Sequence, residues 1–295
     1  MPKASSGARI SRKSVGATIG FTLKEMRTVA NLTQTDLAKV LAVHQAALSR
    51  IENGSQSLQA WQIQRVADYF QVRVDSLFSG KVNYWKIAQR FGTAKVLPER
   101  YREHPLARIR EVVPLLNFAH EQRGRDYVNE MVSGRLGLDS LLFQSPGEPI
   151  GIQCTLDVAR VLLREKVLKH GKIAELTEYT RGESAHDFLH ETYLQQESAL
   201  ALIKVLLLNA HHYNSGFQYR IEDKGKDALA VSIAPAECMK EAAYKDPLLQ
   251  DFVCQYRKAY LASFPAYIGS RSLHVTEPAC QFRGARECTY TIKAA

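Results

Sequence analysis

Residues 32–54 read LTQTDLAKVLAVHQAALSRIENG, and their apolar positions recur every three or four residues in two runs. Thr33, with Asp36 three residues later, resembles a capping box at the start of the first run. A short turn at 42–43 separates the runs, and Gly54 supplies a left-handed cap after the second. The pattern predicts two short helices joined by a tight turn.

The same spacing continues on both sides of this unit. Apolar stripes precede it from Ile19 and follow it as far as Phe78, so the sequence predicts a five-helix domain over residues 17–80. Two helices joined by a short turn form a helix-turn-helix, whose second helix enters the DNA major groove.

The order of residues from Leu32 to Gly54 resembles the lambda-repressor-like helix-turn-helix family, also known from xenobiotic-response-element regulators. The resemblance covers about 60 residues; one departure is Ala42, where the family often has Gly. It implies binding of double-stranded DNA, usually as a homodimer on two half-sites about 34 Å apart. The implied DNA-contacting residues are Gln34, Thr35, His44, Gln45, Ala46, Ser49, Arg50 and Asn53.

The chemistry of these side chains suits a duplex. Gln34 stands in the first turn of its helix, where its amide and the free backbone N–H groups can meet a phosphate. A glutamine such as Gln45 can bond adenine N6 and N7 together, and an arginine such as Arg50 can bond guanine O6 and N7. Ala46 can touch a thymine methyl group. The alternative is a helix bundle that uses these residues only as a solvated face.

The composition is that of a globular protein, and the excess of basic residues favours a polyanionic partner such as a nucleic acid. The 295 residues are 45% hydrophobic, which excludes a disordered or low-complexity chain and suggests about two domains. Lys and Arg number 39 against 30 Asp and Glu, and residues 1–80 hold ten against five. The longest nearly apolar stretch, 199–210, is too short to span a bilayer, and no secretion signal is visible. We expect a cytoplasmic protein with no membrane partner and with reduced cysteines.

The domain boundaries follow from changes in pattern. Residues 1–16 are basic and rich in Ser and Gly, which predicts a flexible arm, either simply solvated or touching phosphates. Residues 81–106 form a connector. Residues 107–295 combine helices, one long one expected over 185–211, with two antiparallel hairpins. The fold class is therefore mainly α with an α+β carboxy-terminal domain.

The last hairpin carries the most specific chemistry. Cys280 and Cys288 are symmetric about Gly284, so a turn there places them opposite each other, with Cβ atoms about 5 Å apart. Two thiolates at that distance can share a tetrahedral Zn²⁺. Glu277 lies three residues before Cys280, and Pro278 can bend the strand to turn the carboxylate inward.

This spacing, with the helix before it, resembles the vinyl-reductase-like sensor domain of phenol-responsive bacterial activators. The resemblance implies a structural zinc held by Cys254, Glu277, Cys280 and Cys288, near a pocket for a small apolar organic effector. His274 or Cys238 could replace one ligand, and a metal-free thiol cluster or a disulfide is the alternative. Neither tryptophan, Trp61 or Trp85, lies in this domain, which counts against a phenol ligand.

Catalytic motifs are missing from the sequence. His186 and His190 are four residues apart, but Asp187 stands where a zinc protease motif needs Glu, and no phosphate-binding loop or nucleophile elbow is present. The sequence therefore predicts a non-enzymatic, one-component transcription regulator whose carboxy-terminal domain senses a ligand and dimerises. The alternatives are a repressor with a purely dimerising domain, or a reductase or lyase on the same fold.

Overall fold

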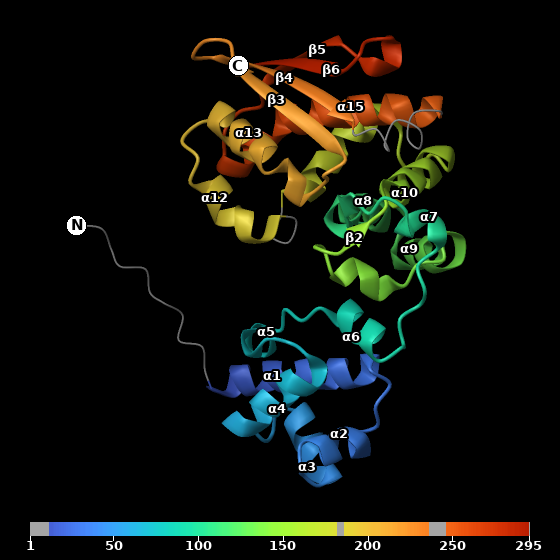
Figure 1. Cartoon of the computed structure of the whole chain (residues 1–295), viewed down its shortest axis with the longest axis vertical. Helices are drawn as coiled ribbons and strands as arrows, with labels where there is room; N and C mark the ends of the chain where they lie inside the picture. Colours follow the sequence, from blue (N-terminus) through green and yellow to red (C-terminus); the bar gives the residue numbers. More distant parts are fainter. Residues whose placement is uncertain (1–11, 182–185, 236–245, 295) are drawn as a thin grey trace, which may run out of the picture. The chain divides into compact units, whose positions relative to one another are not determined.

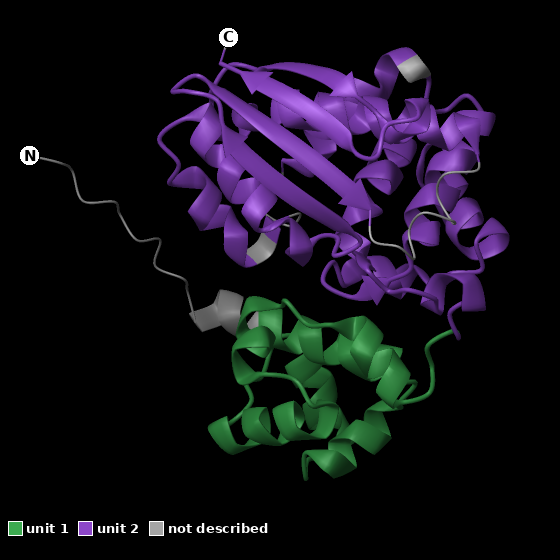
Figure 2. Cartoon of the chain, turned by 45° about the horizontal axis from the view of Figure 1, so that its top comes forward, with its two compact units in different colours: residues 1–95 green, residues 96–295 purple. Residues whose placement is uncertain are grey.

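The computed structural model describes residues 12–181, 186–235 and 246–294. The chain divides into two compact units, residues 1–95 and 96–295, each with its own hydrophobic core (Figure 2). Of the helices in the described ranges, none combines the length and the hydropathy that a bilayer crossing needs.

The first unit is entirely helical in its described part (Figure 1). The region of the predicted five-helix domain contains α1 to α5, and α6, inside the predicted connector, packs into the same core. Helix α1 begins inside the predicted arm, whose residues 1–11 lie outside the described residues. The bounds are α1 (Arg12–Val29), α2 (Gln34–Val40), α3 (Gln45–Glu52), α4 (Ala60–Phe70), α5 (Val74–Ser79) and α6 (Tyr84–Arg90).

Local signals fix the two central helices. Thr33 Oγ1 accepts a hydrogen bond from the Asp36 amide (3.1 Å), and the Asp36 carboxylate accepts one from the Thr33 amide (3.0 Å), so the capping box is complete. At the other end of α2, the amides of Val43 and Ala42 donate to the carbonyls of Ala38 and Lys39. This pair of bonds is the Schellman motif, which requires a left-handed residue. Ala42 is that residue, at φ 53°.

Ala42→Gly is therefore expected to stabilise the first unit. An L-residue in the left-handed region is strained by about 1–2 kcal/mol, and the larger unfolded-state entropy of glycine offsets part of this gain. We expect a net increase of about 0.5–1 kcal/mol in the free energy of unfolding, measured by urea titration. Ala47→Gly, inside α3 with ordinary helical geometry, should lower it by about 1 kcal/mol. An Ala42→Gly protein that is less stable than the parent would contradict the proposed backbone strain at Ala42.

In the second unit, helices cover one face of a small sheet (Figure 1). Its α-helices are α7 (Glu99–Arg102), α8 (Val113–Arg123), α9 (Arg125–Asn129), α10 (Ile152–Arg164), α12 (His190–Leu194), α13 (Ala199–Leu208) and α15 (Pro247–Ser263). Its strands are β1 (Ala107–Arg108), β2 (Pro149–Ile150), β3 (Phe217–Asp223), β4 (Ala228–Pro235), β5 (His274–Ala279) and β6 (Cys288–Lys293). Short 3₁₀ turns or a π turn are η1 (Ile109–Glu111), η2 (Glu130–Arg135), η3 (Ser140–Gln144), η4 (His170–Thr180), η5 (Asp187–Leu189), η6 (Ala210–His212), η7 (Phe264–Ile268) and η8 (Gln281–Arg283). The predicted mainly α, α+β class is confirmed.

The larger sheet has the antiparallel order β3-β4-β6-β5, and its apolar face packs against α13 and α15. Strands β5 and β6 pair with Ala279 opposite Thr289, the register that symmetry about Gly284 predicts. The register shifts by one residue between Thr276 and Ala279, so the strand bends at Glu277 and Pro278.

One predicted helix is wrong. The described part of 185–211 contains separate segments, η5, α12, α13 and η6, instead of one long helix. Ser198 breaks the run, because its hydroxyl accepts a hydrogen bond from the Ala201 amide (3.2 Å) and so caps α13.

Candidate nucleic-acid interface, thiol cluster and cavity

Helices α2 and α3 lie against each other and present the residues predicted to contact DNA (Figure 1). Gln34 and Thr35 begin α2, His44 is the N-cap of α3, and Asn53 follows its last turn. The exposed members are Thr35, His44, Gln45, Ala46, Arg50 and Asn53, and the half-buried ones are Gln34 and Ser49.

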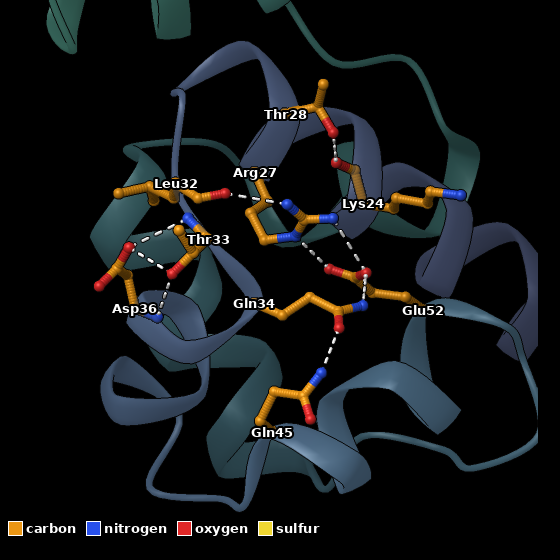
Figure 3. Close-up of polar contacts among 9 residues, drawn as sticks. All are labelled: Lys24, Arg27, Thr28, Leu32, Thr33, Gln34, Asp36, Gln45 and Glu52. Carbon is orange, nitrogen blue, oxygen red and sulfur yellow. Dashed lines mark hydrogen bonds and ion pairs between the residues drawn. The ribbon is translucent and has the colours of Figure 1, made fainter.

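A chain of polar contacts fixes the start of α3 (Figure 3). Glu52 is buried and accepts from Arg27 at both oxygens, with Nε–Oε1 at 2.6 Å and Nη2–Oε2 at 3.2 Å. Gln34 Nε2 donates to Glu52 Oε2 (2.8 Å), and Gln45 Nε2 donates to Gln34 Oε1. Arg27 also donates to the Leu32 carbonyl (2.9 Å), so α1, α2 and α3 are joined through one carboxylate.

These side-chain contacts leave part of the Gln45 amide available for a further hydrogen-bonding partner. One amide hydrogen of Gln45 is used on Gln34, and its Oε1 and second hydrogen remain at the exposed surface. An oxygen acceptor beside an N–H donor is the pair that adenine N6 and N7 require. Arg50, one turn further along, donates from Nε to Gln56 Oε1 (3.1 Å), which holds the side chain while its guanidinium stays exposed.

In the second unit, the thiol cluster brings together three of the four predicted metal ligands. One ligand atom from each of Cys254 on α15, Glu277 on β5 and Cys280 lies within 4.8 Å of the others. The two sulfurs are 3.4 Å apart, close to the roughly 3.8 Å of a tetrahedral zinc site with 2.3 Å bonds. Glu277 Oε1 is buried without a hydrogen-bond partner in the described chain, while Oε2 accepts from Arg283 (3.0 Å). A buried carboxylate oxygen beside two thiols fits a cation.

Cys288, the fourth predicted ligand, is fully buried on β6 and lies next to Cys254. A hydrogen bond from the Cys254 thiol lowers the pKa of Cys288, and the same bond raises the pKa of Cys254. Cys288 is outside the mutual 4.8 Å group. Of the alternative ligands, His274 is exposed and Cys238 lies outside the described residues.

A mostly apolar cavity of about 210 Å³ lies within the second unit, between α15, α13, η1 and the sheet. Its apolar wall is formed by Pro114, Leu115, Ile152, Leu156, Leu206, Leu207, Ala210, Phe217, Ile233, Phe252, Val253 and Leu261. Its polar lining is formed by Arg110, Glu111, Thr155, Thr180, His186, Tyr213, Asn214, Tyr219, Tyr256, Arg257 and Tyr260.

Burial shifts the pKa of two titratable groups in this wall toward the uncharged form. Burial raises the pKa of Glu111 to about 8, although its carboxyl accepts a hydrogen bond from Asn214 (3.1 Å). Burial lowers the pKa of His186 to about 4. His186 therefore donates from Nε2 to the Thr180 carbonyl (2.6 Å) and accepts at Nδ1 from the Tyr213 hydroxyl (2.7 Å). Both ring nitrogens are occupied, so His186 is not placed to bind a metal.

Sequence reasoning missed several of these groups. Arg27 and Glu52 escaped notice because nothing local pairs positions 25 residues apart, although a carboxylate inside an apolar helix face was a signal. The cavity residues on α15 had a clearer signal. Phe252, Tyr256 and Tyr260 follow each other at four-residue intervals, and their rings stack with centroids 5.7 and 6.0 Å apart.

Comparisons with known proteins bear on the first unit. Residues 18–77 match the family model of the helix-turn-helix domain. No curated protein matches the chain. Among solved structures, the Fe(II) unliganded H-NOX protein from K. algicida is similar to 63% of this chain and 95% of its own, at 10% identity and a TM-score of 0.44. The helix-turn-helix domain supports a DNA-binding regulator, and the structural likeness is too distant to carry an argument.

Proposed function

We propose that the chain is a one-component transcription regulator. Residues 17–80 read double-stranded DNA, through Gln34, Thr35, His44, Gln45, Ala46, Ser49, Arg50 and Asn53, and residues 107–295 bind a small organic effector and form a homodimer. The observation that carries the DNA-reading part is the Arg27–Glu52–Gln34–Gln45 chain, which holds an amide ready for a base at the exposed start of α3.

The effector-binding part is supported by the cavity, which a purely dimerising domain does not need. An effector can act only if it binds two states of the regulator with different affinity. The thiol cluster belongs to the same proposal: Cys254, Glu277, Cys280 and Cys288 hold a structural zinc, which ties α15 to the last hairpin. The cytoplasmic location stays a prediction.

Gln45→Ala tests the DNA-reading part. We expect the variant to lose about 1–3 kcal/mol of discrimination at one base pair, because the adenine bonds of Gln45 disappear. Selection of binding sites from a random duplex library, followed by measurement of Kd at fixed salt, gives the preference at each position. Gln64→Ala, on the exposed face of α4, is the matched control and should leave every preference unchanged. Identical preferences in the parent and the Gln45 variant contradict the proposed base contact.

A further inference from the structure

The size of the cavity limits its occupant. An apolar cavity of about 150 Å³ is known to hold one benzene molecule. The cavity in the second unit measures about 210 Å³, so it accommodates one ring with a small substituent, or a short chain of equal bulk. Side chains such as Ile152, Leu156, Leu206 and Phe252 provide an apolar surface for that body.

The polar part of the wall is rich in hydrogen-bond donors. Thr155 Oγ1 is buried with no hydrogen-bond partner in the described chain. The phenols of Tyr256 and Tyr260 line the same wall, and burial raises the pKa of both. A buried hydroxyl without a partner costs about 1–3 kcal/mol, which a ligand that accepts hydrogen bonds recovers.

Two arginines add positive charge to the same wall. The Arg257 guanidinium lies 4.1 Å from the centroid of the Phe217 ring, and that of Arg110 lies 5.5 Å from the Tyr213 ring. Both rings also line the cavity, so the guanidiniums are held at its surface. Against these two charges the lining contains one carboxyl group, that of Glu111. The lining therefore has a net positive formal charge in an environment of low dielectric constant.

We propose that the cavity binds a small organic acid, whose carboxylate lies against Arg257 and Arg110 while its ring or short chain lies among the apolar side chains. This inference rests on the proposed effector-sensing function and specifies the chemical class of the effector. A carboxylate accepts several hydrogen bonds and carries the charge that the guanidiniums complement. A neutral aromatic molecule would fill the volume but bring no negative charge to the two guanidiniums.

Calorimetric titration of the full chain at pH 7 with benzoate and with benzamide tests the inference. The two molecules have nearly the same shape, and only benzoate is charged. Because a hydrogen bond to a charged group contributes about 1.5–3 kcal/mol, benzoate is expected to bind at least about tenfold more tightly. Arg257→Met keeps the bulk of the side chain and removes its charge, and is expected to bring the two affinities within about threefold of each other.

Controls separate charge recognition from folding. The measured quantity is the ratio of the benzamide Kd to the benzoate Kd on one sample. Partial unfolding of a variant weakens both apparent affinities and leaves this ratio unchanged. Arg220→Met, at an exposed position of β3, should keep the parental ratio. Equal affinity for both ligands, a benzoate preference that survives Arg257→Met, or no benzoate binding at millimolar concentration each overturns the inference. Binding of benzamide without benzoate would overturn the organic-acid inference and still support effector sensing. The DNA-reading part of the proposed function is tested separately, because the base preference of the Gln45 variant is measured without either ligand.

Discussion

Gly20→Ala is expected to lower the free energy of unfolding of the first unit by about 3 kcal/mol. A Cβ at position 20 would lie 2.2 Å from the Ile51 carbonyl oxygen and 3.1 Å from that of Glu52. Both oxygens belong to the backbone of α3, so no side-chain rotation relieves the contact, and α1 and α3 must move apart. The better helix propensity of alanine recovers only about 1 kcal/mol of this strain.

The same substitution should weaken DNA binding more than the loss of folded protein explains. Glu52 joins Arg27 on α1 to Gln34 on α2. A shift of α3 therefore breaks the series of side-chain contacts that orients Gln45. Urea unfolding gives the stability, and the Kd for a selected duplex, corrected for the folded fraction, gives the second effect.

Gly134→Ala is the control for this prediction, since the nearest atom to its added Cβ is the flexible Glu130 Cγ at 3.8 Å. It should change the stability by less than about 1 kcal/mol. A Gly20→Ala protein with parental stability would show that the two helices do not pack at this distance.

The first unit was predictable from the sequence because its signals are local. Helical periodicity, the Thr33 capping box and the cap at Gly54 each act within a few residues, and all three are present. The network of polar contacts behind the start of α3 was not predictable in the same way. Arg27 and Glu52 meet only after α1 packs on α3, and the close approach at Gly20 that permits this packing has no local signature.

In the second unit, too, features with local sequence signals were predictable and features built from distant segments were not. Symmetry about Gly284 predicts the pairing of the last hairpin next to its turn, because that pairing is a local property, but it does not predict the shift of one residue beyond Glu277 and Pro278. The cavity depends on segments distant in sequence, such as η1, α10 and α15, and no pattern predicts their convergence. The failed prediction of one helix over 185–211 has the opposite cause: apolar spacing was strong there, and the single cap at Ser198 outweighed it.

Helix α15 connects the two features of the second unit. Cys254 belongs to the thiol cluster, and Tyr256 and Arg257, two and three residues later, line the cavity. Arg257 also helps to lower the pKa of Cys288, so its guanidinium lies within electrostatic range of the cluster. A metal bound by Cys254 would therefore also restrain the turn of α15 that carries Tyr256 and Arg257.

Removal of zinc is expected to destabilise the second unit strongly. Protein purified without chelator should contain about one zinc per chain, because Cys254, Glu277 and Cys280 already converge and Cys288 is adjacent. A ligand that binds only the folded state stabilises it by RT ln(1 + [L]/Kd), which is about 4 kcal/mol when free zinc exceeds Kd a thousandfold. Chelation should therefore lower the thermal midpoint of the second unit and leave that of the first unit unchanged.

Two cysteine substitutions separate loss of metal from loss of packing. Cys280→Ser should reduce the zinc content and make the thermal midpoint insensitive to chelator, since one thiolate ligand is gone. Cys154→Ser replaces an equally buried thiol on α10 that is not among the grouped ligand atoms, so it should lower stability through packing while zinc content stays near one per chain. Elemental analysis and calorimetry give both quantities. Less than a tenth of a zinc per parental chain, or a Cys280→Ser protein that still responds to chelator like the parent, would refute the metal site and leave a metal-free thiol cluster.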